Sequence, residues 1–550
     1  MSIDPDLTTA HLLLARAGDP HPGLLFEDRC WSWAEVVDEC TARAHWLLER
    51  RDPSRPFHVG VMLENEPEYL FLIGGAALAG AAVVGVNLTR RGAELAGDIR
   101  FTDCQLVVTS TALAPLLAGL DTGAVIVPHD EDGYRADLRR CAGRPAPEPP
   151  ADPRATLLLL FTSGSTGRPK AVICSTGRFA AIAQHWHMDL GRDDVSYNAM
   201  PLFHGNALMA GWASPLATGG TYALARRFSA SRFLDDVISF RATYFNYVGR
   251  SLAYILAQPE RPEERQHRLR CCFGTEASSW DRAEFERRFG VAPTESYGSS
   301  EGALTLRRAP GAPPDSLGLP PPGMAAAVLD PATMRECPRA RFDSRGLLLN
   351  SEEAIGELAS LHGAAAFEGY YKNPDAEAQR VRGQVYLTGD LGYRDEQGWF
   401  YFAGRGIDWL RVDSENFAAA PVERILSRFP GVGLVAVYPV PDERTGDQVM
   451  AAIQLAGGAG FDAAAFGRFL AEQPDLGTKW APRYVRLVAS VPVTATRKID
   501  KLTLRRERWE VTDPVYHRPA PDLAYQPLTA AGRARIRQGF AAFGRENLLR

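Results

Sequence analysis

Short runs of Val, Leu and Ile recur along most of the chain, each bounded by Gly or Pro and followed by a longer amphipathic stretch. Apolar runs that alternate with helical segments in this way are typical of the strands of an α/β protein. The sequence therefore predicts an α/β protein: a large N-terminal domain of several subdomains, with β-sheets flanked by helices, and a small α+β C-terminal domain. The runs that carry this pattern lie at residues 57–63, 106–109, 124–127, 156–162, 196–200 and 432–438.

The pattern changes after Gly404, where a charged turn, GRGIDWLRVDSEN, precedes a new series of helix and strand segments. A chain of 550 residues is longer than one ordinary domain of about 100–200 residues. We therefore expect a domain boundary at this turn, with domains at residues 1–404 and 405–550. In the second domain we expect helices at 421–429 and 461–472 and a strand at 432–440.

Charge and cysteine content exclude several classes of protein. The chain holds 61 Lys+Arg against 66 Asp+Glu, a net charge of −5, which argues against a dedicated nucleic-acid-binding protein. Its 8 cysteines form no Cys-x-x-Cys pair, so we expect neither a structural zinc site nor a disulfide framework. The N-terminal residues lack the basic segment and apolar core of a secretory signal. The expected location is the cytoplasm.

Residues 70–86 carry no charge and need to be weighed against a membrane span. They are short for a bilayer-spanning helix, which needs about 20 apolar residues, and they contain several glycines. We therefore expect a helix that ends near Gly80, followed by a buried strand.

The stretch at residues 156–172, TLLLLFTSGSTGRPKAV, carries the strongest chemical signal. An apolar strand leads into a loop of Ser, Thr and Gly that ends in a lysine. Consecutive backbone N–H groups, hydroxyls and an ammonium are what a polyphosphate needs. The loop is not the usual P-loop, because Pro169 precedes Lys170 and Ala171 follows it. A flexible Ser/Gly turn is the alternative interpretation.

Residues 163–170, SGSTGRPK, resemble the phosphate-binding signature of the acyl-adenylate-forming (AMP-binding) superfamily. Its members are acyl- and aryl-CoA synthetases, peptide-synthetase adenylation domains and luciferases. A weaker N-terminal motif is matched by residues 87–95, NLTRRGAEL. The other motifs follow in the order of the superfamily: YGSSEG at 297–302, YLTGD at 386–390, Gly404-Arg405, and PVTATRKIDK at 492–501.

This resemblance implies that a carboxylate attacks the α-phosphorus of ATP, forming an acyl adenylate and releasing pyrophosphate. ATP, Mg²⁺ and CoA are the implied cofactors. Lys498 is the implied catalytic residue. Glu301 is implied as a second catalytic residue and as the metal ligand, because a carboxylate suits the hard Mg²⁺ ion.

The resemblance also implies the nucleotide-binding residues. Lys170 and the preceding loop would hold the β- and γ-phosphates, and Ser300 would donate to the α-phosphate. Asp390 would accept from the ribose hydroxyls, and Tyr297 would stack on adenine. The full implied set is Ser163, Gly164, Ser165, Thr166, Gly167, Lys170, Gly274, Thr275, Glu276, Ala277, Tyr297, Gly298, Ser300, Asp390 and Arg405.

An acyl pocket is implied at His204, Gly205 and Asn206, although a structural role for His204 fits the sequence as well. Small residues follow in the same region, at Gly205, Ala207, Ala210 and Gly211. Together with the resemblance to one branch of the superfamily, given below, they favour a long-chain or bulky polycyclic carboxylic acid. In the second step the acyl group would pass to the thiol of CoA. The resemblance implies that the small domain is mobile and rotates for this step about a hinge at Ile407 and Asp408.

Residues 405–423 look most like the very-long-chain acyl-CoA synthetase and fatty-acid transport protein branch, which Asp408, Arg411, Glu415 and Asn416 match. Asp413 and Ser414 depart from that pattern, and they keep open an amine or a carrier-protein thiol as the acceptor. Two further alternatives are a binding protein that has lost catalysis and an NTPase that cuts the β–γ bond. The expected partners are a small carboxylic acid, ATP and CoA. We expect no nucleic acid and no integral membrane segment, and a homodimer is an allowed assembly.

Overall fold

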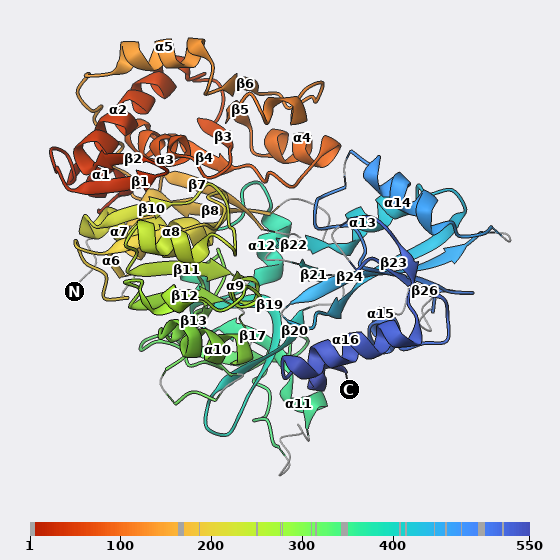
Figure 1. The fold of residues 1–550 in the computed structure, drawn as a ribbon. Helices are drawn as coiled ribbons and strands as arrows, with labels where there is room; N and C mark the ends of the chain where they lie inside the picture. Colours follow the sequence, from red (N-terminus) through yellow and green to blue (C-terminus); the bar gives the residue numbers. More distant parts are fainter. Residues whose placement is uncertain are drawn as a thin grey trace.

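The structure of the protein is a computed structural model. Figure 1 shows the C-terminal elements, in blue, gathered at one side of the large domain. The structure describes residues 6–162, 170–185, 188–248, 251–275, 277, 279–309, 311–313, 316–342, 350–405, 409–412, 415–444, 446–456, 459–474, 476–492, 501–519 and 522–549.

The first sheet contains the earliest of the predicted strands. Its strands lie in the order β6-β5-β3-β4-β7-β8 and run parallel, except that β8 is antiparallel to β7. β3, β4 and β5 are buried along their whole length, and strands of a parallel sheet that are covered on both faces read as continuous apolar runs. The strands are β3 (His58–Met62), β4 (Ala82–Gly85), β5 (Cys104–Thr109), β6 (Val125–Pro128), β7 (Thr156–Thr162) and β8 (Lys170–Ser175), and the nearby helices are α1 (Thr9–Leu14), α2 (Trp33–Arg50), α4 (Gly92–Phe101), η1 (Ala114–Leu116), α5 (Asp132–Cys141) and α6 (Thr176–His185).

The uncharged stretch at residues 70–86 forms a buried helix and a strand, as expected. α3 (Pro67–Ala79) is buried along almost its whole length and packs on α2. A Cβ atom at Gly74 would lie 2.3 Å from the Cys40 sulfur, so a glycine is needed for this close crossing. The helix ends at Gly80, whose φ of 71° is readily adopted by glycine. Among the described residues, no helix is long and apolar enough to cross a membrane.

The second sheet has the order β14-β13-β12-β11-β9-β10-β1-β2. It is parallel from β13 to β1 and closes with an antiparallel strand at each edge. Ligand sites of α/β proteins tend to lie where the carboxyl ends of parallel strands meet. The strands are β1 (Pro22–Phe26), β2 (Arg29–Ser32), β9 (Val195–Asn198), β10 (Thr221–Leu224), β11 (Tyr244–Val248), β12 (Cys271–Thr275), β13 (Pro293–Tyr297) and β14 (Leu306–Arg307); the helices are η2 (Asn206–Trp212), α7 (Ala213–Thr218), α8 (Phe233–Ser239), α9 (Ser251–Leu256), η3 (Pro262–Arg265) and α10 (Ser279–Phe289).

The third sheet is antiparallel and has the order β15-β20-β19-β17-β16, with β18 paired to β19. Two of its longer strands carry predicted site residues: Asp390 lies on β19 (Val385–Arg394) and Arg405 ends β20 (Phe400–Arg405). The remaining elements are β15 (Ser316–Gly318), β16 (Ala326–Leu329), β17 (Gly356–Ser360), β18 (Val381–Arg382), α11 (Ser351–Ala354), η4 (Gly363–Ala365) and α12 (Pro374–Arg380).

The C-terminal domain opens with the hairpin β21 (Trp409–Val412) and β22 (Glu415–Ala418). Its main sheet has the order β23-β24-β25-β26-β27 and packs against α13 and α14 in a separate apolar core. The helices and the strand expected here are present, with ends that differ by a few residues. The elements are α13 (Ala419–Leu426), β23 (Val432–Pro441), β24 (Asp447–Leu455), α14 (Ala463–Ala471), β25 (Tyr484–Leu487), α15 (Lys501–Glu507), β26 (Val515–His517), β27 (Gln526–Pro527), α16 (Ala530–Ala542) and η5 (Glu546–Leu549).

Polar contacts join the hairpin side of the C-terminal domain to the large domain. The Oγ1 atom of Thr89 in the large domain donates to Glu415 (2.9 Å). Within the C-terminal domain, the Nε1 atom of Trp480 donates to the other oxygen of Glu415 (3.1 Å) and so holds that side chain. Elsewhere Arg444 donates to the carbonyl oxygen of Ala253 (2.9 Å). In this structure the β21–β22 hairpin therefore faces the segment that precedes α4.

Candidate active site

The predicted phosphate loop lies between two paired strand ends. Thr162, at the end of β7, pairs in register with Lys170, at the start of β8. Ser163, Gly164, Ser165, Thr166 and Gly167 lie outside the described residues. The described ends show that a strand leads into this loop and that its lysine is held by a second strand.

Lys170 is 2% exposed, and its Nζ atom lies 5.5 Å from the centre of the Tyr370 ring. Burial is the main reason that the pKa of Lys170 falls to about 8; the charge of Arg380 lowers the pKa further and Glu301 raises it. Lys170 and Arg380 thus lie near Glu301, and Arg380 also pairs with Glu357 (3.8 Å). A cluster that contains two cations can attract an anion. A phosphate beside Lys170 would stabilise its charged form.

Glu301 is the carboxylate of this group and is 7% exposed. Its Oε1 atom accepts a hydrogen bond from the hydroxyl of Tyr370 (2.8 Å). In the described part of the chain, no group of three or more His, Cys, Asp or Glu could hold a metal ion. Mg²⁺ is commonly held by one or two carboxylates together with substrate phosphates. A buried carboxylate close to the predicted phosphate site fits that mode, and Glu301 is the residue that would hold the ion.

Asp390 and Tyr297, the predicted ribose and adenine residues, lie next to each other. The hydroxyl of Tyr297 donates to Oδ2 of Asp390 (2.7 Å), although the two residues are 93 positions apart. The backbone N–H of Asp390 donates to the hydroxyl of Thr388 (3.1 Å). Asp390 also pairs in register with Arg405 across β19 and β20, which places the backbones of the two predicted residues side by side.

The turn after β12 is fixed by Glu295. The backbone N–H of Ala277 donates to Glu295 (2.7 Å), and Arg282 donates both to Glu295 (2.7 Å) and to the carbonyl oxygen of Ala277 (2.8 Å). Gly274 precedes this turn; a Cβ atom there would lie 2.2 Å from the Tyr247 ring. Thr275 ends β12, and Glu276 lies outside the described residues.

Ser300 connects the nucleotide residues to the predicted acyl segment. An ideal Cβ atom on Gly205 would lie 3.4 Å from the Ser300 hydroxyl oxygen and 3.5 Å from the Met209 sulfur. Arg178 donates to the carbonyl oxygen of Ser300 (2.6 Å). Gly298 begins the loop that holds Ser300, and a Cβ atom there would lie 3.7 Å from the backbone oxygen of residue 304 and 3.9 Å from the hydroxyl of residue 305.

His204 is partly buried, and its ring lies 4.4 Å from that of Phe203. Burial lowers the pKa of His204 to about 4, so the ring is neutral near pH 7. Asn206 follows Gly205 and accepts a hydrogen bond from the Nδ2 atom of Asn246 (2.7 Å). The segment is thus polar but uncharged at neutral pH, which suits the acyl part of a substrate better than its carboxylate.

Four residues of this site were missed by sequence reasoning. Tyr370, Arg380 and Arg178 lie in segments without a recognisable motif, and nothing local to the sequence marks them. Glu295 could have been suspected, because it is a charged residue inside a short strand that leads to Tyr297. The predicted catalytic Lys498 and the hinge residues Ile407 and Asp408 lie outside the described residues.

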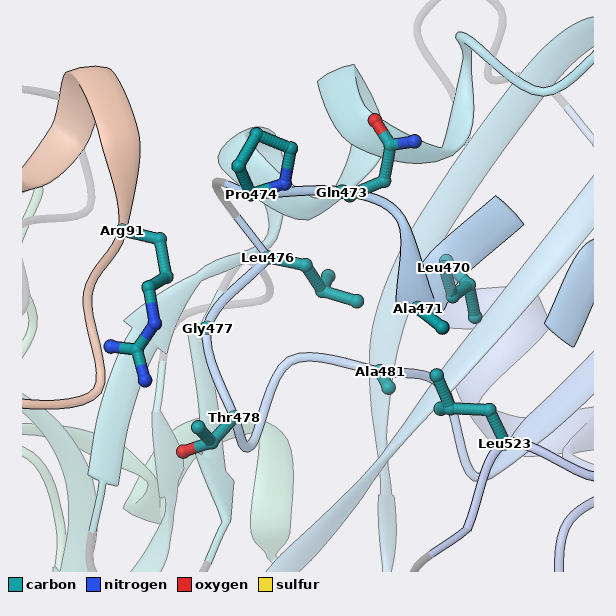
Figure 2. Close-up of a pocket in the computed structure, with 10 residues that line it drawn as sticks. All are labelled: Arg91, Leu470, Ala471, Gln473, Pro474, Leu476, Gly477, Thr478, Ala481 and Leu523. Carbon is teal, nitrogen blue, oxygen red and sulfur yellow. The ribbon is translucent and has the colours of Figure 1, made fainter. Parts of the chain in front are cut away.

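A pocket of about 450 Å³ lies between the large domain and the C-terminal domain. Figure 2 shows the Arg91 side chain on one side and the loop that carries Leu476, Gly477 and Thr478 on the other. Burial lowers the pKa of Arg91, and Glu415 opposes this effect. The residues that line the pocket are Arg91, Leu470, Ala471, Gln473, Pro474, Leu476, Gly477, Thr478, Ala481 and Leu523.

The fold and this arrangement define a two-domain nucleotide-binding enzyme. The chain belongs to the AMP-binding enzyme family, whose model matches residues 15–371, and the model of the family's C-terminal domain matches residues 421–498. This confirms the predicted superfamily and fold class.

Relatives of known name match the chain over nearly all of its length. It is 50% identical to the steroid-22-oyl-CoA synthetase of Rhodococcus jostii, covering 98% of this chain and 99% of that one. It is 44% identical to the medium/long-chain-fatty-acid–CoA ligase FadD17 of Mycobacterium tuberculosis, over 92% and 98%. Among solved structures, the amide bond synthetase of Marinactinospora thermotolerans is 25% identical and covers 91% of this chain and 99% of its own, with a TM-score of 0.76.

The protein is an ATP-dependent, AMP-forming acyl-CoA ligase, an acid–thiol ligase that uses ATP, Mg²⁺ and CoA. The predicted enzyme class and cofactors are thereby confirmed. The particular likeness to the very-long-chain branch stays a prediction.

Proposed function

We propose that the acid this ligase activates is a steroid with a side-chain carboxyl group at C22. The observation that carries the proposal is the 50% identity, over 98% of the chain, to a steroid-22-oyl-CoA synthetase. Identity to the medium/long-chain fatty-acid ligases is lower, at 44%. A long straight-chain acid is the second candidate, and the two acids differ in width rather than in chemistry.

The first step meets an electrostatic barrier that the proposed nucleotide site would lower. Two unit charges 4 Å apart repel by about 4 kcal/mol at an effective dielectric constant of about 20. A carboxylate that approaches a triphosphate therefore needs positive charge around the phosphates more than it needs a base. Lys170 and the loop 163–167 would supply that charge and those donors, and Lys498 would add a second ammonium at the α-phosphate.

The residues around Lys170 and Lys498 would orient the substrates. Asp390, positioned by Tyr297, would accept from the ribose hydroxyls, and a carboxylate can accept two such bonds. Glu301 would hold the Mg²⁺ ion, and the bound ion would neutralise part of the negative charge of the phosphates. The acid would lie along His204, Gly205 and Asn206, with its carboxylate toward Ser300.

The pocket in Figure 2 is the proposed entry for CoA. Its volume of about 450 Å³ lies in the usual range for small-molecule sites. Arg91 offers a cation to the phosphates of CoA, and Thr478 offers a hydroxyl. Arg91→Ala should raise the KM for CoA and leave the KM for ATP unchanged. The matched control is Arg154→Ala, since Arg154 is 88% exposed and pairs with Asp152.

Domain organisation, location and assembly complete the proposal. A boundary between residues 404 and 405 is supported by the family matches on either side of it, with Ile407 and Asp408 as the hinge of a mobile small domain. The cytoplasm is the proposed location, because all eight cysteines are free thiols and a reducing compartment preserves thiols. A homodimer is the proposed assembly, to be tested by light scattering.

The identity of the acid is tested by measuring pyrophosphate release and acyl-CoA formation in parallel. The substrates are a steroid-22-oic acid, octanoate and hexadecanoate, each with and without CoA. We expect the highest kcat/KM for the steroid acid. A higher value for either straight-chain acid would overturn the steroid proposal and leave the ligase itself intact. Release of orthophosphate in place of pyrophosphate would contradict both.

A further inference from the structure

The helix that follows the proposed acyl segment begins with an uncommon turn. Residues Asn206–Trp212 form a π-helix, which continues without a break into α7. Its wider turn is marked by the N–H of Ala213, which bonds to the carbonyl oxygen of Leu208 five residues earlier. π-Helical turns are rare and are frequently found at functional sites. This one starts one residue after Gly205.

A row of hydroxyl groups crosses the sheet under this helix. Ser196 on β9 pairs in register with Tyr222 on β10 and with Tyr244 on β11, so the three side chains lie next to one another. All three are buried, and each hydroxyl donates to a backbone carbonyl oxygen of the π-helix. These bonds are Tyr222 to Ala207 (3.2 Å), Tyr244 to Ala210 (2.7 Å) and Ser196 to Gly211 (3.0 Å).

Two asparagines extend this polar surface toward the acyl segment. Asn246, 2% exposed on β11, donates from Nδ2 both to Asn198 (2.9 Å) and to Asn206 (2.7 Å). Asn198 in turn donates to the carbonyl oxygen of Met200 and accepts from its N–H. Gly211 permits the close approach, because a Cβ atom there would lie 3.1 Å from Asn246.

Buried hydroxyl and amide groups cost free energy unless they are hydrogen-bonded. Here their partners are the carbonyl groups of one helix, at the positions that the wider π-helical turn gives them. If the helix relaxed to α-helical geometry, these carbonyl oxygens would rotate away from the row of hydroxyls. The bonds therefore favour the π-helical form over the α-helical form of the same residues.

Two side chains of the π-helix keep part of their surface exposed: Asn206 and Met209. The other residues of this helix are buried. A change from π- to α-helical geometry would rotate Asn206 and Met209 relative to Gly205 and Ser300. The width of the space that they border thus depends on which helical form is stabilised.

We propose that Ser196, Tyr222, Tyr244 and Asn246 are positioning residues that hold the π-helix and so set the width of the acyl pocket. The proposal rests on the acyl pocket proposed above. These residues do not touch the acid. They hold Asn206 and Met209 where a wide, rigid acid is accepted in preference to a straight chain.

The test uses Tyr222→Phe, Tyr244→Phe and Ser196→Ala, each of which removes one hydroxyl group. The readout is the ratio of kcat/KM for a steroid-22-oic acid to that for hexadecanoate, with the KM for ATP measured beside it. We expect each change to lower the ratio about fivefold, since one hydrogen bond is worth about 1 kcal/mol, and to leave the KM for ATP within about twofold. Ser196→Thr keeps a hydroxyl group and should restore the ratio.

Tyr197→Phe is the matched control. Tyr197 is also buried on β9, but its hydroxyl bonds to Asp236 on the opposite face of the sheet. Its removal should leave the ratio unchanged. An equal loss of kcat/KM for both acids in the three test variants, or an unchanged ratio in folded protein, would overturn the proposal. If the tyrosine variants do not fold, the pair Ser196→Ala and Ser196→Thr decides.

Met209→Ala and Asn206→Ala separate this inference from the function on which it rests. If neither change alters the KM for any acid, the proposed acyl pocket is wrong. If they alter it and the hydroxyl variants leave the ratio unchanged, only the positioning role fails. If the wild-type enzyme rejects the steroid acid, the steroid proposal fails, and a long-chain acid that carries a terminal cyclohexyl ring replaces the steroid acid in the ratio to hexadecanoate, with the same expectations.

Discussion

The nucleotide side and the acyl side of the candidate site are built from different chemistry. On the nucleotide side, the groups are charged: Lys170, Arg380, Glu301 and Asp390. On the acyl side they are neutral hydroxyl and amide groups, and they bond to each other or to backbone carbonyl oxygens. Charge attracts and orients a polyphosphate, whereas neutral groups can fix the shape of a pocket without favouring water in it.

The same difference is visible in how the two sides respond to pH. Burial lowers the pKa of Lys170 to about 8 and the pKa of His204 to about 4. Lys170 therefore changes charge just above neutral pH, while His204 stays neutral throughout the range in which the enzyme would be assayed. Changes on the nucleotide side should affect ATP, and changes on the acyl side should affect the choice of acid.

The largest expected effect comes from Lys498, the second ammonium proposed for the nucleotide side. Lys498→Ala should slow adenylation by about 10²–10³, the usual cost of removing one group that stabilises developing charge. Conversion of a presynthesised acyl adenylate to the thioester should continue. The measurements are pyrophosphate release and single-turnover thioester formation. Lys372→Ala, at an exposed lysine, is the control, and equal loss of both half-reactions in folded protein would contradict the assignment.

A smaller effect is expected at Asp390. Asp390→Ala removes the proposed acceptor of the ribose hydroxyls, and hydrogen bonds to charged groups are worth about 1.5–3 kcal/mol. The KM for ATP should therefore rise about 10- to 100-fold, with the ratio of kcat/KM between acids unchanged. Asp132→Ala, at a fully exposed aspartate, controls for loss of charge alone. A change in the ratio of kcat/KM between the acids would show that the nucleotide side and the acyl side do not act separately.

Much of the fold could be predicted because apolar runs and glycine positions report local structure. The buried strands of the first sheet and the helix that ends at Gly80 follow directly from the sequence. On the nucleotide side, Lys170, Asp390 and Glu301 stand in short motifs with charged or Gly-rich neighbours. The structure places Tyr297 next to Asp390, and their roles in nucleotide binding stay predictions.

The parts of the site that the sequence did not predict depend on contacts between segments far apart in the sequence. Tyr370 meets Glu301 across 69 positions, and Arg178 meets Ser300 across 122. Residues 206–212, NALMAGW, have the composition of an ordinary helix. Their π-helical form depends on hydroxyl groups that stand in other strands, where Tyr and Ser are unremarkable residues. Neutral positioning groups leave no local signal, so the sequence alone could not indicate them.

The third prediction uses pH to separate the two sides. Lys170 loses its proton as the pH rises through about 8, so kcat/KM for ATP should fall about tenfold between pH 7 and pH 9. The KM for the acid should not change, because His204 is neutral throughout. Lys170→Arg keeps the charge and should remove the fall. If the KM for the acid changed with pH in the same way as kcat/KM for ATP, the two sides would not differ in their response to pH.

The same titration of Lys170 should raise the free energy of unfolding as the pH rises, whereas it lowers kcat/KM for ATP. The pKa of Lys170 is lowered from 10.5 to about 8 on folding, so between these values the unfolded chain holds a proton that the folded chain has released. The contribution of Lys170 to the free energy of unfolding therefore rises with pH across this window. Chemical denaturation of the wild type and of Lys170→Met at pH 7 and pH 9 measures it. An equal pH dependence in both would show that Lys170 is not the group responsible.

The smallest expected effect compares two tyrosine hydroxyls, of the half-buried Tyr297 and of the buried Tyr244, by the same substitution. Tyr297→Phe removes the donor to Asp390 (2.7 Å), and the KM for ATP should rise about fivefold, the worth of one ordinary hydrogen bond. Tyr244→Phe removes a hydroxyl of the π-helix support and should change only the ratio between acids. Both substitutions delete one oxygen atom. If one changes the KM for ATP and the other changes the ratio between acids, the size of the substitution cannot explain the difference. If Tyr297→Phe altered the acid ratio as much as Tyr244→Phe does, the hydroxyl groups would act through general stability, and the two sides of the site would not be separable.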